Sequence, residues 1–324
     1  MTDSLRKFLL ALLMAVGLYG AFVIFSGFES LKNALQNFSW WTLFATLGLA
    51  TANYGLRFLK WLYYLRILKI QPIPLRDNIL AFLSGFALTV TPGKLGEMFK
   101  SAVLQSTYQI PAERTAPIVL AERLTDVISI VFMVLVGSTA FSGGLLWAIA
   151  GAVAVVAGLL LLHWNAPSDL LFQRLEKSQF KISNLVPQLK VARDSLQTTT
   201  QIDKLWYPSL LSTLGWTAEA SGLWLLLQGF GQPISEKLAL FFYSTSMLAG
   251  ALIPVPGGLG VTEAMIQGQL VELGGVTSAT ATGAMLLLRL ATLWWAVALG
   301  FISLALLKRR FPQLLRASEN IEEA

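Results

Sequence analysis

Ten ionisable side chains stand within apolar stretches of this sequence, where a charge is costly unless it is paired or used. Arginine binds phosphate through a planar pair of donors, so the cations among them predict a site for an anion. The acidic members could neutralise these cations in an empty site, or carry a coupled proton. The cations are Arg57, Lys94, Lys100, Arg123 and Arg289, and the acids are Glu97, Glu122, Asp126, Glu219 and Glu263.

The spacing of these residues leaves a simpler alternative open. Arg123 and Asp126 are three residues apart, as are Glu97 and Lys100, so each pair would share one face of a helix. Such pairs could be internal ion pairs that hold helices together. The charges nevertheless gather around two breaks in the apolar pattern, which favours a polar chamber.

The two breaks are rich in proline and glycine. Proline removes a backbone donor and glycine loosens the chain, so a continuous helix is not expected at either break. Broken backbone at membrane depth is tolerated only inside protein or beside water, which predicts re-entrant helical hairpins over 78–106 and 237–274. Half-helix N-termini there would add backbone donors for an anion. The residues of the two turns are Pro92, Gly93 and Gly96, then Pro256, Gly257, Gly258 and Gly260.

The sequence contains none of the motifs expected for metal binding, nucleotide binding or catalysis. The sequence has no cysteine and one histidine, His163, so we expect neither a metal site nor a cofactor. A GxxxxGK[ST] string and a DxD-like cluster are both absent, and we therefore do not expect an enzyme. The pI near 9.5 is read as basic loops beside anionic lipid, and nucleic acid is not an expected partner.

The elements that must position these residues are membrane-spanning helices. The chain is 55% hydrophobic and only 13% charged, against about 25% charged in a typical soluble protein. Its apolar blocks approach the ~20 residues that cross a bilayer and show no strand-like alternation. We predict an all-α polytopic membrane protein with two re-entrant hairpins and six spanning helices at 7–27, 40–65, 114–139, 143–163, 205–230 and 280–307.

An internal repeat is indicated by three pairs of landmarks, each separated by nearly the same length of chain. The PGxLG string at Pro92 matches the one at Pro256, Arg123 matches Arg289, and Arg57 takes a place similar to that of Glu219. Each half is predicted to consist of a spanning helix, a hairpin and a second spanning helix. Because a single span connects the halves, the second half would have the opposite orientation in the membrane. Inverted repeats are typical of secondary transporters, whose site lies at the repeat interface.

This organisation predicts one transmembrane domain over 1–310 and a polar C-terminal tail over 311–324. Within the domain, repeat 1 covers about 40–139, the connector span 143–163, a cytoplasmic amphipathic segment 168–204, and repeat 2 about 205–307. Seventeen of the 24 lysines and arginines, Lys60 among them, fall on one predicted side, and only Lys32 and Lys237 fall on the other. We therefore expect a multi-pass protein of the plasma membrane with both termini cytoplasmic.

Five strings in order resemble the lysylphosphatidylglycerol synthase transmembrane (flippase-domain) family over roughly residues 5–310. They are Asn53–Trp61, Thr91–Lys100, Ala121–Asp126, Pro256–Glu263 and Leu288–Leu290. The resemblance implies a protein that moves lipid between leaflets: an anionic or aminoacylated phospholipid, or a polyprenyl-phosphate-linked sugar. Family members fused to a cytosolic aminoacyltransferase make lysylphosphatidylglycerol. This chain ends shortly after its last predicted span, so a stand-alone member without that synthase domain is expected.

The leading hypothesis is a lipid flippase working around the chamber, with a phosphate-bearing membrane lipid as its partner. Arg57, Arg123 and Arg289 would bind the phosphate, Lys94 and Lys100 would guide it, and the hairpin glutamates would pair with cations in the empty state. The alternative is an accessory subunit that docks a glycosyltransferase or another lipid-modifying enzyme through 168–204. A lipid-modifying enzyme with an intramembrane site is a third possibility.

Overall fold

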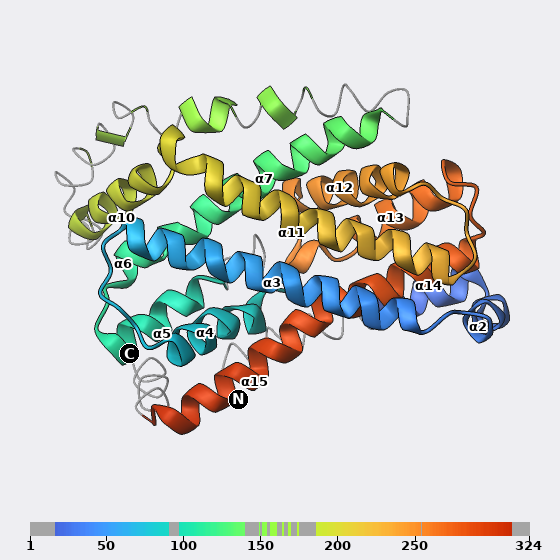
Figure 1. Ribbon diagram of the computed structural model, residues 1–324, viewed down its shortest axis with the longest axis horizontal. Coiled ribbons are helices and arrows are strands. Elements are labelled where there is room, and N and C mark those ends of the chain that lie inside the picture. Colours follow the sequence, from blue (N-terminus) through green and yellow to red (C-terminus); the bar gives the residue numbers. More distant parts are fainter. Residues whose placement is uncertain are drawn as a thin grey trace.

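The chain forms a long bundle of helices (Figure 1). The computed structural model describes residues 17–90, 97–139, 186–253 and 255–312, with isolated positions between 149 and 174. Every regular element in the part that it describes is helical, which agrees with the predicted all-α class. The predicted connector 143–163, the tail from 313 onward and the turn residues Pro92, Gly93, Lys94 and Gly96 lie largely or wholly outside these residues.

Four long helices coincide with predicted spans. They are α3 (Trp41–Ile67), α7 (Pro117–Ser138), α11 (Ile202–Gly229) and the continuous helix Ser278–Arg310, which joins α14 (Ser278–Arg289), η5 (Leu290–Trp294) and α15 (Trp295–Arg310). Among the described helices, only Ser278–Arg310 is both long and apolar enough by itself to cross a membrane. The other three exceed ~20 residues but carry buried charges, which lower their hydropathy: Arg57 and Lys60 in α3, Glu122 and Asp126 in α7, and Glu219 in α11.

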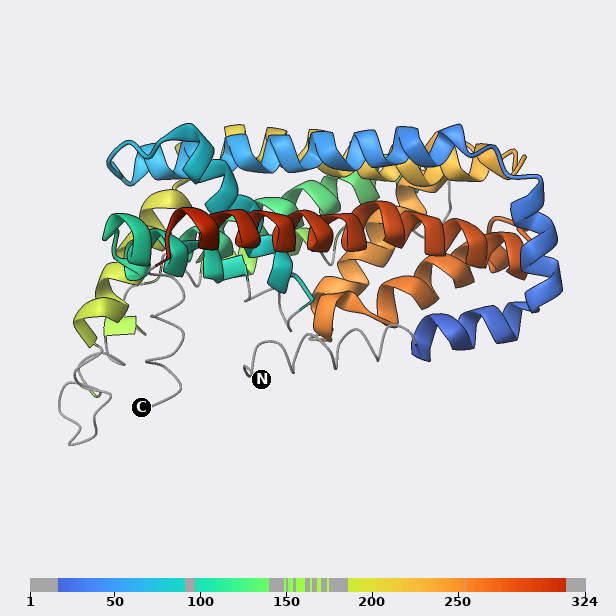
Figure 2. The same cartoon turned by 90° about the horizontal axis from the view of Figure 1, so that it is seen from below.

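Helices α3 and α11 lie side by side along the whole bundle (Figures 1 and 2). Gly215, Gly222 and Gly229 recur every seven residues on α11 and face α3, where a Cβ atom would lie within 3.0 Å of a neighbouring side chain. The missing side chains bring the two backbones close enough for the Thr46 hydroxyl to donate to the Gly222 carbonyl at 3.2 Å. This seam is a feature that the sequence analysis missed.

Each predicted hairpin is a pair of packed helices with a break between them. The first consists of α4 (Leu75–Ser84), the short helix η1 (Gly85–Leu88) and α5 (Phe99–Tyr108). The second consists of α12 (Glu236–Leu252), η4 (Pro256–Gly258) and α13 (Val261–Glu272). Ten-residue helices such as α4 and α5 extend only ~15 Å, which is about half a bilayer core.

The two hairpins lie in opposite halves of the bundle, and their broken ends meet near its centre (Figure 1). Gly257 adopts a φ of 61°, a left-handed conformation that favours glycine, and a Cβ built there would lie 3.4 Å from Val90 Cα. Val90 in turn packs with Leu293 and Val297 of the continuous helix Ser278–Arg310. The two breaks therefore form one contact region in the interior.

Each half of the chain packs its final helix on the hairpin of the other half. Helix α7 lies against α12, with Gly137 facing Phe241, while α15 lies against α4 and η1, with Gly300 facing Phe86 and Ala87. Both glycines allow direct contact with the backbone opposite. This exchange is the reciprocal packing that two related halves would make.

The end of α15 is held against the first hairpin by a polar contact. Asp77 is buried, and its Oδ2 accepts from the Tyr108 hydroxyl at 2.5 Å and from Arg310 Nη2 at 3.2 Å. Its Oδ1 lies 2.6 Å from Arg310 Nε in the same ion pair. Burial, and then the hydrogen bond to Asp77, raises the pKa of Tyr108 to about 12. Tyr108 therefore stays a neutral donor in this contact near neutral pH.

Two further helices are described at the ends of the bundle. Helix α10 (Val186–Thr199) lies within the predicted amphipathic segment and packs on α6 (Ala112–Thr115) and α7. Helix α2 (Phe28–Gln36) packs on α14 at the opposite end (Figure 2). The helix Gly17–Ser26 is the described part of the first predicted span.

Candidate functional site

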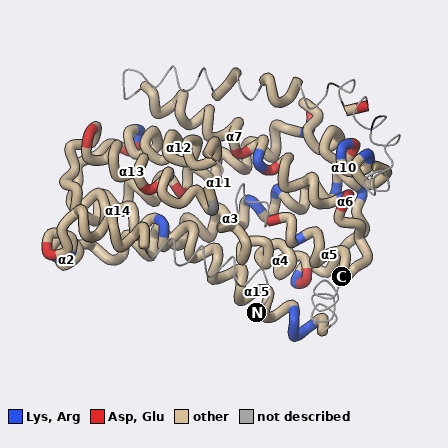
Figure 3. Tube along the Cα trace, turned by 180° about the vertical axis from the view of Figure 1, so that it is seen from behind, with Lys and Arg blue, Asp and Glu red and all other residues tan. Residues whose placement is uncertain are grey.

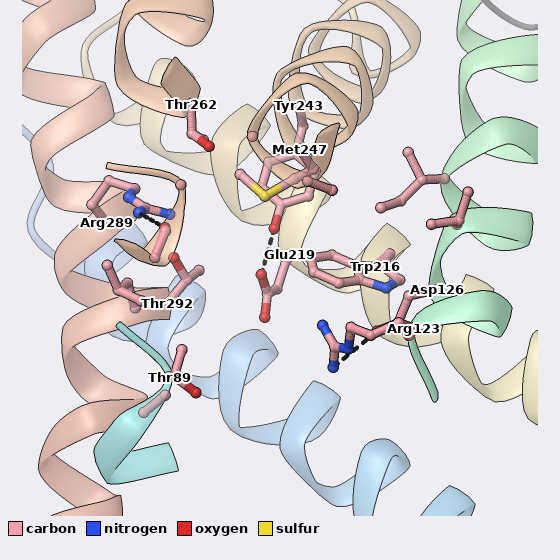
Figure 4. A pocket seen from close by; sticks show the side chains of 18 of the residues that line it. Thr89, Arg123, Asp126, Trp216, Glu219, Tyr243, Met247, Thr262, Arg289 and Thr292 are labelled. Atoms are coloured by element: carbon pink, nitrogen blue, oxygen red, sulfur yellow. Dashed lines mark hydrogen bonds and ion pairs between the residues drawn. The ribbon is translucent and has the colours of Figure 1, made fainter. Parts of the chain in front are cut away.

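A cavity of about 240 Å³ lies in the middle of the bundle, between the long helices and the two hairpin breaks. Three arginines, Arg57, Arg123 and Arg289, and two carboxylates, Asp126 and Glu219, line it together with polar and apolar side chains. Arg289 and Thr262 lie on one side, Arg123 and Asp126 on the other, and Glu219 between them (Figure 4). Figure 3 marks the acidic and basic residues along the Cα trace, and several of them lie midway along the helices of the bundle.

The first hairpin brings Glu97 to two of these arginines. Glu97 Oε2 accepts from Arg57 Nη2 of α3 at 2.8 Å and from Arg123 Nη2 of α7 at 3.2 Å. Thr89, just before the break, donates to Glu97 Oε1 at 3.3 Å. One buried carboxylate thus joins the hairpin to both long helices, α3 and α7.

The second hairpin repeats this arrangement with Glu263. Its Oε1 pairs with Arg289 Nε at 2.7 Å, and its Oε2 accepts from the Gly260 amide at 2.7 Å. Arg289 Nη2 also donates to the Gly257 carbonyl at 2.9 Å. Glu97 precedes Glu263 by the same length of chain as Arg123 precedes Arg289, so the two glutamate–arginine pairs occupy equivalent places in the sequence.

The first helix also reaches this second pair. The Tyr19 hydroxyl donates to Glu263 Oε1 at 3.3 Å and accepts from Trp294 Nε1 at 3.2 Å. The rings of Tyr19 and Trp294 meet edge to face. Tyr19 and Trp294 therefore cover the Glu263–Arg289 ion pair from the side of the first helix.

Lys60 does not lie on the cytoplasmic surface, where the sequence analysis had placed it. It was counted among the cytoplasmic lysines, but its side chain is fully buried, with Nζ 2.7 Å from Asp126 Oδ1 and 2.7 Å from Ser212 Oγ. Asp126 also pairs with Arg123 at 3.1 Å, as the i, i+3 spacing predicted. Lys60 lies three residues after Arg57 on α3, which places both on the inner face of that helix.

Lys100 and Glu122 form a separate buried pair outside the cavity lining. Their Nζ and Oε2 atoms are 2.7 Å apart, and neither side chain is more than 2% exposed. Lys100 Nζ also lies over the Trp61 ring, 4.3 Å from its centroid. The partner of Lys100 thus comes from α7, whereas the sequence had suggested an i, i+3 relation to Glu97.

Glu219 is held by neutral donors. Asn53 Nδ2 donates to Glu219 Oε1 at 2.5 Å, and the Tyr243 hydroxyl donates to Glu219 Oε2. Trp216, one turn earlier on α11, lines the cavity beside it. The sequence analysis missed Asn53, Tyr243 and Trp216. Asn53 and Tyr243 are polar residues in the interior of apolar helices, which was the signal available for them.

A π-helical segment follows Arg289 in the continuous helix Ser278–Arg310. This segment, η5, widens the turn between α14 and α15, and the Tyr54 hydroxyl of α3 donates to the Thr292 carbonyl within it. Such segments are frequent at functional sites. Here it places Thr292 and Leu293 in the cavity wall next to α3.

The arrangement can bind an anion through arginine donors whose counter-charges are already in place. Among the described residues, no group of three or more His, Asp or Glu side chains is placed to hold a metal ion. The structure brings Arg57, Arg123, Asp126, Glu219 and Arg289 to the cavity, with Glu97 and Glu263 directly behind the arginines. An all-helical bundle that encloses a charged cavity is typical of a membrane protein with a polar pathway.

Comparison with known proteins agrees with this class. The model of the lysylphosphatidylglycerol synthase transmembrane region matches residues 8–300. The chain belongs to that family, which confirms the resemblance seen in the sequence. It is also similar to a UPF0104 membrane protein of Methanothermobacter thermautotrophicus strain Delta H, with 23% identity over 322 residues and 93% of each chain covered.

Proposed function

We propose that this membrane protein moves a lipid with a phosphate headgroup between the leaflets of the plasma membrane. The observation that carries the proposal is the convergence of Arg57, Arg123 and Arg289 on one interior cavity. Arg57 and Arg123 share Glu97, so a phosphate that approaches them competes for donors already oriented by a buried carboxylate. The substrates considered are an anionic or aminoacylated phospholipid and a polyprenyl-phosphate-linked sugar.

An inverted repeat around this cavity would give the transporter two alternative openings. The equivalent ion pairs of the two hairpins and the exchanged packing of α7 and α15 support related halves. The half-bilayer length of α4 and α5 supports re-entrant hairpins with the cavity between their breaks. Both termini would be cytoplasmic, and the two halves would rock around a fixed headgroup site.

The test is lipid translocation by purified protein in phosphatidylethanolamine–phosphatidylglycerol vesicles. Fluorescent phosphatidylglycerol in the inner leaflet should become accessible to an external quencher when the protein is present. The double variant Arg123→Ala, Arg289→Ala should lower the rate at least about tenfold, because a hydrogen bond to a charged group contributes about 1.5–3 kcal/mol.

The matched control is Arg66→Ala, Arg309→Ala, which removes two exposed arginines outside the cavity lining and should keep the wild-type rate. Equal rates for wild type and the cavity variant would overturn the roles of Arg123 and Arg289. If the wild type moves neither this lipid nor a polyprenyl phosphate, the transport proposal itself fails and the accessory-subunit hypothesis replaces it.

A further inference from the structure

Glu219 differs from the other buried carboxylates in what holds it. Glu97, Glu122, Asp126 and Glu263 each have a lysine or arginine nitrogen at 2.8 Å or closer. For Glu219, the bonds found among the described residues come from the neutral donors Asn53 and Tyr243. It is only 6% exposed, lies deep within the 28-residue helix α11, and lines the cavity.

The charged and titratable groups around Glu219 come from four helices. Tyr54 and Arg57 belong to α3, Tyr243 to α12, Arg289 to α14, and Arg123 and Asp126 to α7. The arginines and Asp126 are engaged in the ion pairs described above. Glu219 is therefore the cavity carboxylate whose charge can change without breaking an ion pair of this network.

A phosphate that enters the cavity would change the net charge of this network of ionisable side chains. In and around the cavity, five cations, Arg57, Lys60, Lys100, Arg123 and Arg289, stand against five carboxylates, Glu97, Glu122, Asp126, Glu219 and Glu263. The Arg123 side chain is 22% exposed, and the remaining buried carboxylate of the described residues, Asp77, pairs with Arg310 at the end of α15. A phosphodiester adds one negative charge close to Glu219, and like charges repel strongly in a water-poor interior. A proton taken up from water by Glu219 would cancel that added charge.

We propose that Glu219 binds a proton when the cavity binds a lipid phosphate, and that this couples headgroup binding to proton uptake. The protonated carboxyl keeps its neighbours: Asn53 still donates to the carbonyl oxygen, and the new O–H donates to the Tyr243 hydroxyl, which then acts as the acceptor. The proton returns to water when the lipid leaves. The inference rests on the proposed function, since it concerns the same cavity.

Thermodynamic linkage between proton binding and lipid binding determines the direction in which lipid affinity changes with pH. If binding takes up a proton, lipid affinity rises as pH falls, by up to about tenfold per pH unit for one proton. Dihexanoylphosphatidylglycerol is a suitable probe, because its phosphodiester does not itself titrate near neutral pH. Calorimetric titration in two buffers of different ionisation enthalpy then measures the protons taken up per lipid bound.

We expect the wild-type protein to take up a substantial fraction of one proton per lipid, and Glu219→Gln to take up close to none while still binding. The amide imitates the protonated carboxyl, so its affinity should not depend on pH. The matched control, Glu236→Gln, removes an exposed carboxylate at the start of α12 and should retain the wild-type proton uptake.

Equal proton uptake by wild type and Glu219→Gln would overturn the assignment and leave the anion site intact. Absence of any lipid binding by wild type would instead count against the proposed function. Should Glu219→Gln fail to fold, Tyr243→Phe offers a second test, because it removes one donor to the ionised carboxylate. The pH at which lipid affinity changes should then move upward, and an unchanged pH profile would contradict the proposal.

Discussion

Lys100→Met is expected to lower the free energy of unfolding by about 3–5 kcal/mol, the usual effect of removing one partner of a buried ion pair. The substitution leaves Glu122 only 1% exposed at its side chain and without its ammonium partner. Glu122 Oε1 already lacks a hydrogen-bond partner among the described residues, so no second hydrogen bond to the carboxylate replaces the one from Lys100. Denaturant titration in mixed micelles measures the change.

Two further variants test whether the loss of stability comes from the unpaired buried charge of Glu122. Lys100→Met combined with Glu122→Gln should recover much of the stability, because a neutral pair avoids the buried charge. Lys32→Met breaks an exposed ion pair with Glu29 and should cost no more than about 1 kcal/mol. If Lys100→Met were as stable as Lys32→Met but slow in translocation, Lys100 would belong to the lipid path, as the sequence had suggested.

Gly300→Leu is expected to destabilise the protein by at least ~3 kcal/mol, at the upper end of what overpacking causes. A Cβ atom at this position would lie 2.2 Å from Ala87 N and 2.7 Å from Phe86 C. These are backbone atoms of the first hairpin, so no side-chain rotation can relieve the overlap. Helix α15 must move away from η1, and we expect both thermal stability in detergent and lipid translocation to fall.

Gly48→Leu is the matched control for this substitution. Gly48 also lies within a helix, but it is exposed on α3 and nothing lies within 4 Å of a Cβ built there. Leucine should be tolerated at this position, with a gain of up to about 1 kcal/mol from helix propensity. Similar melting temperatures for the two variants would show that α15 does not need direct backbone contact with the hairpin.

The helical class and the breaks were readable in the sequence because they depend on local properties. Apolar length predicts α3, α7, α11 and the helix Ser278–Arg310 to within a few residues, and Pro256-Gly257-Gly258 marks the break between α12 and α13, where the α-helix does not continue. The charges of the candidate site were also evident, since any ionisable group in an apolar run is conspicuous. Family membership followed from the same strings.

The partner of each charge was decided only by the tertiary structure. Lys60 and Lys100 resemble surface lysines or lipid guides in a linear sequence, yet α3, α5, α7 and α11 enclose both of them against Asp126 and Glu122. Glu219 is distinguished from the other acids only by the neutral side chains of α3 and α12 that reach it. Ion pairing depends on distances between helices far apart in the chain. Local composition does not encode those distances. The sequence alone therefore identified the charged residues, and only the tertiary structure showed which of them are paired.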